Sequence, residues 1–541
     1  MLAPLFFIVF LLSGCGEEAL INVADSRKNA SPVIFGEPQY SVRVGESYRF
    51  EPVANDLDDD KLLYSVSGKP RWAEFDPATG MLWGTPKEQD PGTYPDIIIK
   101  VTDGMDEDAL GPFSITVVGA NAVAPPPVEY NLDSEVFPIG SPPQVAAGES
   151  YADPLSGYQV LRITDVDNLN PPRSKKNPGK VLDGVLNEYA IPDIENADGS
   201  MLIVMATNSN FWYLYDVQSG AYIKELTKLS AAAEPRWDVS DPNILYYRKG
   251  AALYRYDVSG DQSVLLYDFR QDYPDMQSIT SGTKGEASAD GRYRPFIVRA
   301  GGPAADLDWI VFDFKTNSIV GSYVTATGSR PAFKAKYCVL SPSGNYVLVN
   351  STQAPGGYRP YVYRRDFSGE RRMGTRKGHF DFALDAAGRE VFVAQDSDTD
   401  WITATYLEDL SEQNLLKLNF SSSTYVGLHL SGNNYDRPGW VLVSTYGPQT
   451  SRGEQPAIWS DGTHYMLEIK ENGRHWRVAQ TFTRFPQTNK KYYWLEAAAT
   501  INRSGTRIYW GANHHDQRDK YVDLYQLTLP ESWYRDLQEQ Q

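Results

Sequence analysis

The histidines are the residues of this sequence best suited to transfer protons or bind a metal ion at neutral pH. The chain has six of them: His379, His429, His464, His475, His514 and His515. Three are spaced in a related way around a recurring glycine turn. His379 and His429 lie nine and ten residues before Gly388 and Gly439, and His514 lies nine residues after Gly505. We therefore expect these three to meet at one place, as proton-transfer groups or metal ligands.

Other polar and aromatic residues occupy the same two positions relative to these turns. They are Tyr189, Glu234 and Glu496 before the turn, and Arg299, Asn350, Gln395 and Tyr446 after it. A guanidinium can pair with the carboxylate of an acidic sugar, and Arg299 and Arg236 are the candidates for this role. Glu234 and Glu496 are the carboxylate pair that a glycosidase would need. Arg437, only two residues before its turn, is expected at the opposite face in a structural ion pair.

A degenerate repeat must position these residues. From about Tyr158 onward, each unit has a short strand, a tight turn, and further strands that often end in a Tyr-Asp pair. Seven units align on their turn residues: Gly199, Pro242, Gly291, Gly344, Gly388, Gly439 and Gly505. The spacing between successive turns runs from 43 to 66 residues, which suits four-stranded blades, whereas a solenoid would be more regular. The sequence therefore predicts an all-β protein whose residues 158–530 form a seven-bladed β-propeller.

Propeller geometry explains why the two turn-related positions should coincide. The innermost strand of a blade begins at one mouth of the central channel, and the second strand returns to that mouth. Residues at both positions therefore converge from all blades.

Composition and missing motifs exclude several classes of function. The chain has 69 acidic and 51 basic residues and a formal charge of -18, whereas nucleic-acid binding needs a basic surface. The sequence has no P-loop, no GxSxG elbow, no HExxH helix and no CxxC pair. Phosphoryl transfer, esterase, zinc-protease and thiol-redox activities therefore lack support.

Residues 32–119 predict a separate β-sandwich, because short alternating runs are divided by Gly, Pro and Asp turns. The runs KPRW at 69–72, FDPATGMLWGTP at 75–86, DPGTY at 90–94 and VTDG at 101–104 resemble the immunoglobulin/cadherin-like modules of bacterial surface proteins. Such modules often bind calcium, and a solvated acidic loop is the alternative reading of the same aspartates. The aspartates concerned are Asp56, Asp58, Asp59, Asp60, Asp103 and Asp106. Residues 16–31 are expected to be a tether, 120–157 a proline-rich linker and 531–541 a C-terminal tail.

Residues 1–15 form a short apolar run that ends in Leu12-Ser13-Gly14-Cys15. The run has the length of a signal peptide rather than of a permanent membrane span. The tetrapeptide resembles the lipobox of bacterial lipoproteins, which implies cleavage before Cys15, acylation of Cys15 and anchoring to the cell envelope, most simply the outer membrane. No Lys or Arg precedes the run, which departs from the usual pattern. An ordinary signal peptide with a chance cysteine is the alternative.

An anchored chain with an immunoglobulin-like module and a propeller is similar to secreted bacterial polysaccharide lyases, such as ulvan lyases and oligogalacturonate lyases. The resemblance concerns the architecture of residues 158–530 and includes no diagnostic motif. It implies β-elimination on an acidic polysaccharide. In that reaction Arg299 would neutralise the uronate carboxylate, His429 or His379 would act as the base, and Tyr446 would be the acid. The remaining candidates would contact the sugar: Arg236, Tyr189, Asn350, Gln395, Glu234 and Glu496.

The resemblance also leaves alternatives open. Oligogalacturonate lyases use a histidine-rich metal site, so His514 with His379 and His429 would instead hold a divalent ion. A propeller can also be a non-catalytic glycan-binding or interaction platform, or it can carry a glycoside hydrolase.

The lipobox resemblance predicts that the mature protein begins at Cys15 and partitions into detergent, because acyl chains bury their methylenes in the bilayer. Intact-mass spectrometry of membrane-extracted protein should show the chain from Cys15 with acyl groups. Cys15→Ala should release the protein, whereas Cys338→Ala, at the other cysteine, should not. An unacylated, freely secreted wild-type chain would contradict this prediction.

Overall fold

The chain divides into two units, residues 1–124 and 125–541. The computed structural model of the protein describes residues 29, 31–36, 38–39, 41–56, 60–118, 130–209, 211–281, 286–300, 308–323, 337–350, 359–418, 427–446, 458–484, 493–514, 516, 518 and 520–540. Within these residues strands dominate, and the helical segments are η1 (Ala231–Ala233), η2 (Phe269–Gln271), η4 (Tyr493–Leu495) and α1 (Trp533–Glu539). None of the helices so described is long and apolar enough to cross a lipid bilayer. The expected all-β class is confirmed.

The first unit is a β-sandwich. Its described strands form sheets of order β2-β9-β8-β5 and β3-β7-β6, with a separate β1-β4 pair. They are β1 (Val33–Phe35), β2 (Ser41–Arg43), β3 (Tyr48–Phe50), β4 (Val53–Asn55), β5 (Leu63–Ser67), β6 (Ala73–Phe75), β7 (Leu82–Gly84), β8 (Gly92–Thr102) and β9 (Glu107–Val118). Alternation along β8 buries Ile97, Ile99 and Val101 completely, and they share a core with Tyr48 and Leu82. Two sheets that close over one core are the expected immunoglobulin-like arrangement.

The second unit contains seven antiparallel sheets that follow one another along the described chain. In six of them four consecutive strands pair in chain order. The first strands are β12 (Val185–Leu186), β16 (Arg236–Trp237), β20 (Met276–Thr280), β24 (Tyr337–Leu340), β28 (Lys377–Leu384), β32 (Gly427–Ser431) and, in the last sheet, β36 (Thr500–Ile501). The second strands are β13 (Met201–Ala206), β17 (Ile244–Lys249), β21 (Tyr293–Ala300), β25 (Tyr346–Asn350), β29 (Glu390–Asp396), β33 (Trp440–Tyr446) and β37 (Arg507–Ala512).

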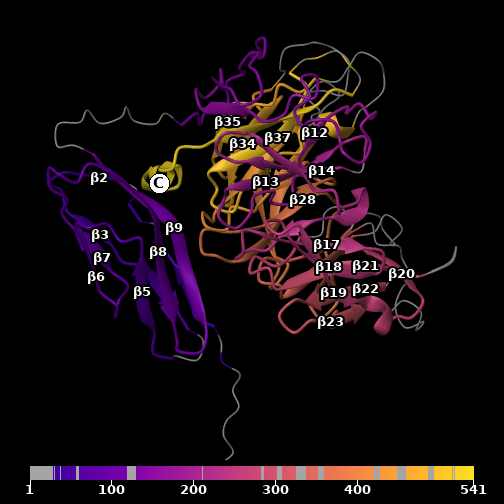
Figure 1. Ribbon diagram of the computed structural model, residues 1–541, viewed down its shortest axis with the longest axis horizontal. Coiled ribbons are helices and arrows are strands. Elements are labelled where there is room, and N and C mark those ends of the chain that lie inside the picture. Colours follow the sequence, from indigo (N-terminus) through magenta and orange to yellow (C-terminus); the bar gives the residue numbers. More distant parts are fainter. Residues whose placement is uncertain are drawn as a thin grey trace, which may run out of the picture. The chain divides into compact units, whose positions relative to one another are not determined.

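The outer strands complete these sheets. The third strands are β14 (Trp212–Asp216), β18 (Ala252–Asp257), β22 (Asp308–Asp313), β26 (Tyr361–Arg364), β30 (Trp401–Tyr406), β34 (Thr463–Glu468) and β38 (Asp523–Thr528). The fourth strands are β15 (Tyr222–Glu225), β19 (Gln262–Asp268), β23 (Ser318–Tyr323), β27 (Arg371–Arg372), β31 (Glu412–Lys417) and β35 (His475–Gln480). First strands of neighbouring sheets contact one another, as β32 contacts β28 on one side and β36 on the other. Figure 1 shows the strands of the second unit, coloured from purple to yellow along the chain. First strands therefore lie innermost, and the sheets have the arrangement of a β-propeller.

The last sheet joins the two ends of the second unit. β11 (Gln159–Arg162) takes the fourth place beside β38, with Val160 opposite Leu527, and β10 (Ser150–Ala152) extends the sheet. An ion pair lies at this junction, because Arg162 Nη2 is 2.7 Å from Asp523 Oδ2. Strands from the start and the end of the unit thus close the ring.

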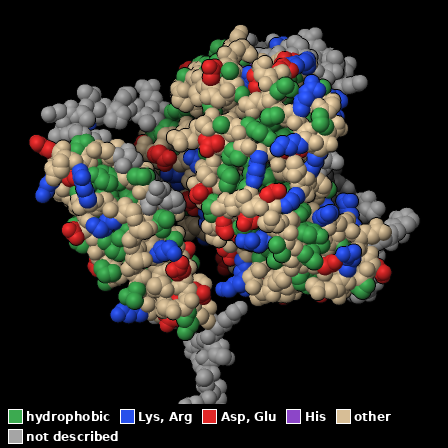
Figure 2. Space-filling model, in the orientation of Figure 1, with side chains coloured by type: hydrophobic (Ala, Val, Ile, Leu, Met, Phe, Trp, Pro, Cys, Tyr) green, Lys and Arg blue, Asp and Glu red, His purple; other side chains and the backbone are tan. Residues whose placement is uncertain are grey.

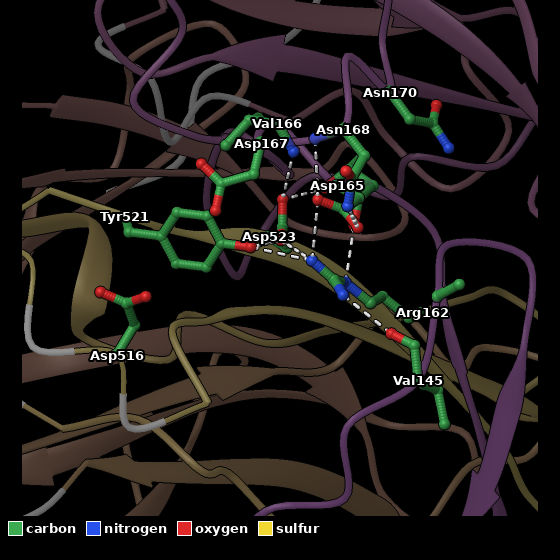
Figure 3. Close-up of polar contacts among 12 residues, drawn as sticks. Val145, Arg162, Asp165, Val166, Asp167, Asn168, Asn170, Asp516, Tyr521 and Asp523 are labelled. Atoms are coloured by element: carbon green, nitrogen blue, oxygen red, sulfur yellow. Dashed lines mark hydrogen bonds and ion pairs between the residues drawn. The ribbon is translucent and has the colours of Figure 1, made fainter.

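Asp523 is the centre of the junction, as Figure 3 shows. Its side chain is completely buried, and its carboxylate accepts hydrogen bonds from Thr164 Oγ1 at 3.1 Å, from the backbone nitrogen of Val166 at 3.2 Å and from Tyr521 Oη at 2.5 Å. Arg162 also contacts Asp165, with 3.1 Å between Nη2 and Oδ1. A buried charge is tolerated only when it is paired and fully hydrogen-bonded, and this one is.

The linker expected over residues 120–157 is shorter in the structure. Tyr130 Oη donates to Asp536 Oδ2 at 2.7 Å, and its ring packs on Trp476 with 5.2 Å between centroids. Asn131 forms a β-bridge with Arg477. Residues 130–157 therefore belong to the second unit. Their proline-rich composition did not reveal this, because an extended chain without regular hydrogen bonding can still pack on a sheet.

The expected C-terminal tail is also packed. α1 buries Trp533 and Leu537 completely, and Trp533 lies against Trp476 with 5.4 Å between ring centroids. The indole nitrogen of Trp533 donates to the carbonyl of Gly505 at 2.8 Å. The helix therefore covers the outer part of the last two sheets.

Ring closure predicts that Asp523→Ala lowers the free energy of unfolding of the second unit by at least about 2 kcal/mol, because it leaves buried donors without their acceptor. Denaturant titration followed by tryptophan fluorescence measures this. Asp516→Ala is the control, since Asp516 pairs with the half-exposed Arg518 and should cost less than about 1 kcal/mol. Equal losses in the two variants would contradict a special role for the junction.

Candidate functional site

Five of the residues selected from the sequence lie together on inner strands and the loops beside them. We call Tyr189, His379, His429, Tyr446 and Glu496 the histidine–tyrosine cluster. His379 and His429 come from the first strands β28 and β32, and Tyr446 ends the second strand β33. Tyr189 follows β12, and Glu496 follows η4. Residues more than 300 positions apart therefore meet because the ring is closed.

The rings of the cluster pack edge to face. The centroids of His379 and His429 are 4.6 Å apart, and the ring of Tyr189 lies 5.1 Å from that of His429. Tyr189 Oη lies 3.5 Å from His379 Nδ1. Tyr446 stacks on the other side of His429 with 5.5 Å between centroids. His379 is half-buried, whereas His429 is 1% exposed. His379 is therefore the histidine that a ligand can reach.

Glu496 determines the tautomer of His429. His429 Nδ1 lies 3.1 Å from the backbone carbonyl of Glu496, which can only accept, so Nδ1 carries the hydrogen. Its Nε2 lies 3.8 Å from the Glu496 carboxylate. The backbone next to Glu496 is itself held, because Ser444 Oγ donates to the carbonyl of Ala497. His429 is thus oriented by its surroundings.

The position of Tyr446 depends on a glycine at the start of β32. A Cβ atom built on Gly427 would overlap the ring and hydroxyl of Tyr446. Burial, followed by the neighbouring phenols and Glu496, raises the pKa of Tyr189 well above its usual value. The Tyr189 hydroxyl therefore stays protonated at neutral pH.

A second group of charged side chains lies beside the first. We call Glu188, Glu234, Arg236, Arg248, Glu286 and Arg294 the arginine–glutamate cluster. Arg236 binds two carboxylates, Glu188 Oε2 at 2.8 Å and Glu286 Oε2 at 3.0 Å. Arg248 Nη2 lies 2.8 Å from Glu234 Oε1, which also accepts from Thr280 Oγ1 at 2.6 Å.

The two clusters are continuous. Glu188 of the second precedes Tyr189 of the first along the chain. Burial, and then Glu496 and Glu188, raise the pKa of the Tyr493 hydroxyl. Tyr493 therefore lies near one carboxylate of each cluster. Although that hydroxyl is enclosed, the residue is 47% exposed. Its ring is therefore an exposed aromatic surface beside the polar groups, which suits contact with a sugar ring.

Several predicted site residues lie elsewhere. Arg299 is exposed near the end of β21, and His514 stacks on Tyr525 with 4.0 Å between centroids and 3.4 Å between its Nε2 and Tyr151 Oη. His514 falls outside the cluster because the chain turns away after β37, with a positive φ of 42° at this residue. Gln395 is half-buried on β29, near Gly378. The side chain of Asn350, and Cys15, lie outside the described residues.

Arg236 and Glu234 are buried but already paired, as described above. Although burial raises the pKa of Glu234, the ion pair with Arg248 and the hydrogen bonds from Thr280 and Ser281 outweigh it and lower that pKa. Arg437 makes an ion pair with Glu531, 3.3 Å between Nη2 and Oε2, in agreement with its expected structural role.

Counting from the turns missed Glu188, Glu286, Arg248, Arg294 and Tyr493. Counting residues from each turn selects one backbone position per strand. The long side chain of a glutamate or an arginine can reach the channel mouth from neighbouring positions as well. Only the charges themselves, three arginines on β16, β17 and β21 and three glutamates in the segments between strands, could have hinted at this cluster.

The described part of the chain has no set of side chains that is arranged to bind a metal ion. No group of three or more His, Cys, Asp or Glu side chains there is arranged to hold an ion. In the first unit, the amide of Asn29 donates to Asp103 Oδ2 at 2.8 Å and to Asp106 Oδ2 at 3.3 Å, where a calcium ion would need open oxygens. Asp58 and Asp59 lie outside the described residues.

Comparison with known proteins identifies the first unit. Residues 32–118 match the family model described as "Putative Ig domain". A search of curated proteins found no match to the sequence.

The solved structures that match include several propellers. An oligogalacturonate lyase in complex with manganese is 17% identical, with 71% of this chain and 96% of that chain covered and a TM-score of 0.49. The Cps50 (Swd1) β-propeller domain of Myceliophteria thermophila is 12% identical, with 58% and 96% covered and a TM-score of 0.33. A mitotic checkpoint complex chain is 10% identical, with 76% and 96% covered and a TM-score of 0.41. These likenesses concern the fold, and no residue role is taken from them.

The packing of Tyr446 over Gly427 predicts that Gly427→Ala lowers the free energy of unfolding by about 1–3 kcal/mol, because the added methyl group overlaps the phenol. Chemical denaturation measures the loss. Gly378→Ala on β28 is the matched control, since the nearest atoms to its Cβ would be the side-chain ends of Gln395, at 3.1 Å, and Ser397, at 3.3 Å. In a Tyr446→Ala background Gly427→Ala should cost little, and an unchanged cost there would contradict the contact.

Proposed function

We propose that the second unit is a polysaccharide lyase that cleaves a uronic-acid-containing glycan, ulvan-like or pectin-like, by β-elimination. The observation that carries the proposal is the contact between the half-buried His379 and Tyr189, 3.5 Å between Nδ1 and Oη, beside His429, Tyr446 and Glu496. This arrangement places a base and a phenolic acid within reach of one reacting group.

His379 is the base in this proposal, and Tyr189 is the acid. His379 takes the proton from C5 of the uronate, and the electrons of that bond form the C4=C5 double bond as the bond from C4 to the glycosidic oxygen breaks. Tyr189 donates its proton to the leaving oxygen. The proton on His379 then passes back to the phenolate across the short contact, so that both groups return to their starting state.

His429 and Tyr446 are positioning residues here. His429 had been a candidate base, but its 1% exposure and its bond to the Glu496 carbonyl keep it from the substrate. It supports the ring of His379 from the side, 4.6 Å away. Tyr446, the candidate acid, stacks on His429. Tyr189 and Tyr446 are both buried, at 4% and 2% exposed, and we assign the acid to Tyr189 because its hydroxyl contacts His379.

The cofactor hypothesis receives no support from the donor set. His379 and His429 would have to hold a divalent ion, but they meet edge to face, and His514 lies with Tyr151 and Tyr525. We therefore route no step of the reaction through a metal. We further propose an acidic polysaccharide as the partner and a lipid anchor on the cell envelope, which the resemblances to polysaccharide lyases and to the lipobox imply.

Glu234 and Glu496 do not form the acid–base pair that a glycoside hydrolase needs. Glu234 is bound to Arg248 with a lowered pKa, so it is not the protonated acid that such an enzyme needs. Non-catalytic glycan binding is the second candidate, because the exposed ring of Tyr493 would stack on a sugar in either case.

A lyase releases an unsaturated product that absorbs in the ultraviolet, which neither a hydrolase nor a binding protein forms. With a uronate polysaccharide, His379→Ala should lower turnover by about a hundredfold or more, because a general base contributes two to four decades. His475→Ala is the control, since His475 packs on Trp459 away from the cluster, 3.9 Å between centroids. A wild-type protein that binds the polysaccharide and forms no unsaturated product would favour the non-catalytic alternative.

A further inference from the structure

Arg294, on the second strand β21, carries a buried positive charge without a carboxylate partner among the described residues. Its side chain is 2% exposed. Nη2 donates to the backbone carbonyl of Glu234 at 3.1 Å, and Nε has no hydrogen-bond partner in the part of the chain that the structure describes. The guanidinium also lies over the ring of Phe296, 5.3 Å from its centroid.

The neighbouring carboxylates are committed to other arginines. Glu188 and Glu286 bind Arg236, and Glu234 binds Arg248. The second oxygen of Glu234 accepts from the backbone nitrogen of Ser281 at 2.7 Å. Three carboxylates thus serve two of the three arginines, and Arg294 receives a neutral carbonyl oxygen only.

Burial leaves the guanidinium of Arg294 with few direct partners, whereas a buried charge is normally held by a direct ion pair. Burial, and then repulsion from Arg236, lower the pKa of Arg294 to about 10, although Glu286, Glu234 and Glu188 lie near enough to act in the opposite direction. The group is still charged at neutral pH. Nη2 of Arg236 and Nε of Arg248 are also buried without partners among the described residues. An anion placed here would satisfy donors that the protein itself leaves open.

We propose that Arg294, with Arg236 beside it, forms an anion subsite that takes the carboxylate of a uronic acid. Arg236 binds Glu188, the residue before Tyr189, so the subsite adjoins the proposed base and acid. Arg294 also replaces Arg299 as the group that neutralises the uronate. The two lie five positions apart on β21 and therefore point to opposite faces, and Arg299 is the exposed one. This assignment of the substrate class rests on the proposed function.

The test uses sodium glucuronate, which has no glycosidic bond and is not cleaved, with the full chain in isothermal titration calorimetry. The wild type should bind it, and Arg294→Gln should bind at least about tenfold more weakly, because a charge-assisted hydrogen bond contributes 1.5–3 kcal/mol. Arg294→Lys keeps the charge but not the planar guanidinium that can make two hydrogen bonds to a carboxylate, so its affinity for glucuronate should fall between the two. Arg255→Gln is the matched control, since Arg255 is 44% exposed on β18.

Thermal melting separates a ligand site from a structural one. Without ligand, Arg294→Gln should melt no lower than the wild type, because the change breaks no direct ion pair and glutamine can still donate to the Glu234 carbonyl. Glucuronate should raise the melting temperature of the wild type and not that of Arg294→Gln. A lower melting temperature for Arg294→Gln, with unchanged glucuronate affinity, would overturn the proposal.

The remaining outcomes separate the ligand from the reaction. Equal affinity for acetate and glucuronate, or an equal response to neutral glucose, would overturn the assignment to an acidic sugar. Binding through Arg294 with no unsaturated product from a uronate polymer would refute the lyase and support the subsite. Turnover with the same KM in Arg294→Gln would support the lyase and overturn the subsite.

Discussion

Closure of the ring by β11 and β38 is the constraint on which the second unit depends. An open row of sheets would expose both edges, and its inner strands would not surround a common axis. The junction is sealed by pairing between Val160 and Leu527 and by the buried Asp523 carboxylate with Arg162. The two strands lie more than 350 residues apart in the chain. Their pairing therefore holds all the sheets between them in one closed ring.

The histidine–tyrosine cluster is a direct consequence of closure. Tyr189 from the first sheet and Glu496 before the last one both reach His429, and they can do so only when these sheets are neighbours in a ring. Local packing then refines the geometry. Gly427 leaves room for Tyr446, and the Glu496 carbonyl sets the hydrogen of His429. Long-range topology thus brings the groups together, and short-range contacts orient them.

Figure 2 shows that on the face it draws, acidic and basic side chains are interspersed, so charges of both signs alternate over this surface.

The interior of the second unit is different, because charges gather there in one network. Arg236 and Arg248 are matched by carboxylates, and Arg294 is not. A buried guanidinium without a direct ion pair breaks the usual rule for buried charges, and such exceptions are typical of functional sites.

The sequence by itself determined the all-β class, the sandwich predicted over residues 32–119 and the succession of sheets, because alternation and turn residues are local properties of the chain. Spacing from the turns also selected Tyr189, His379, His429, Tyr446 and Glu496, since every blade repeats the same path. It failed for His514, whose backbone leaves the strand, and for Arg299, which lies on the solvent side of β21. Only the tertiary structure decided that residues 130–157 pack on the second unit, that Arg236 and Glu234 are already paired, and that Arg294 is not. Burial and the pairing of charges depend on which distant side chains arrive at one point, and no local pattern encodes that.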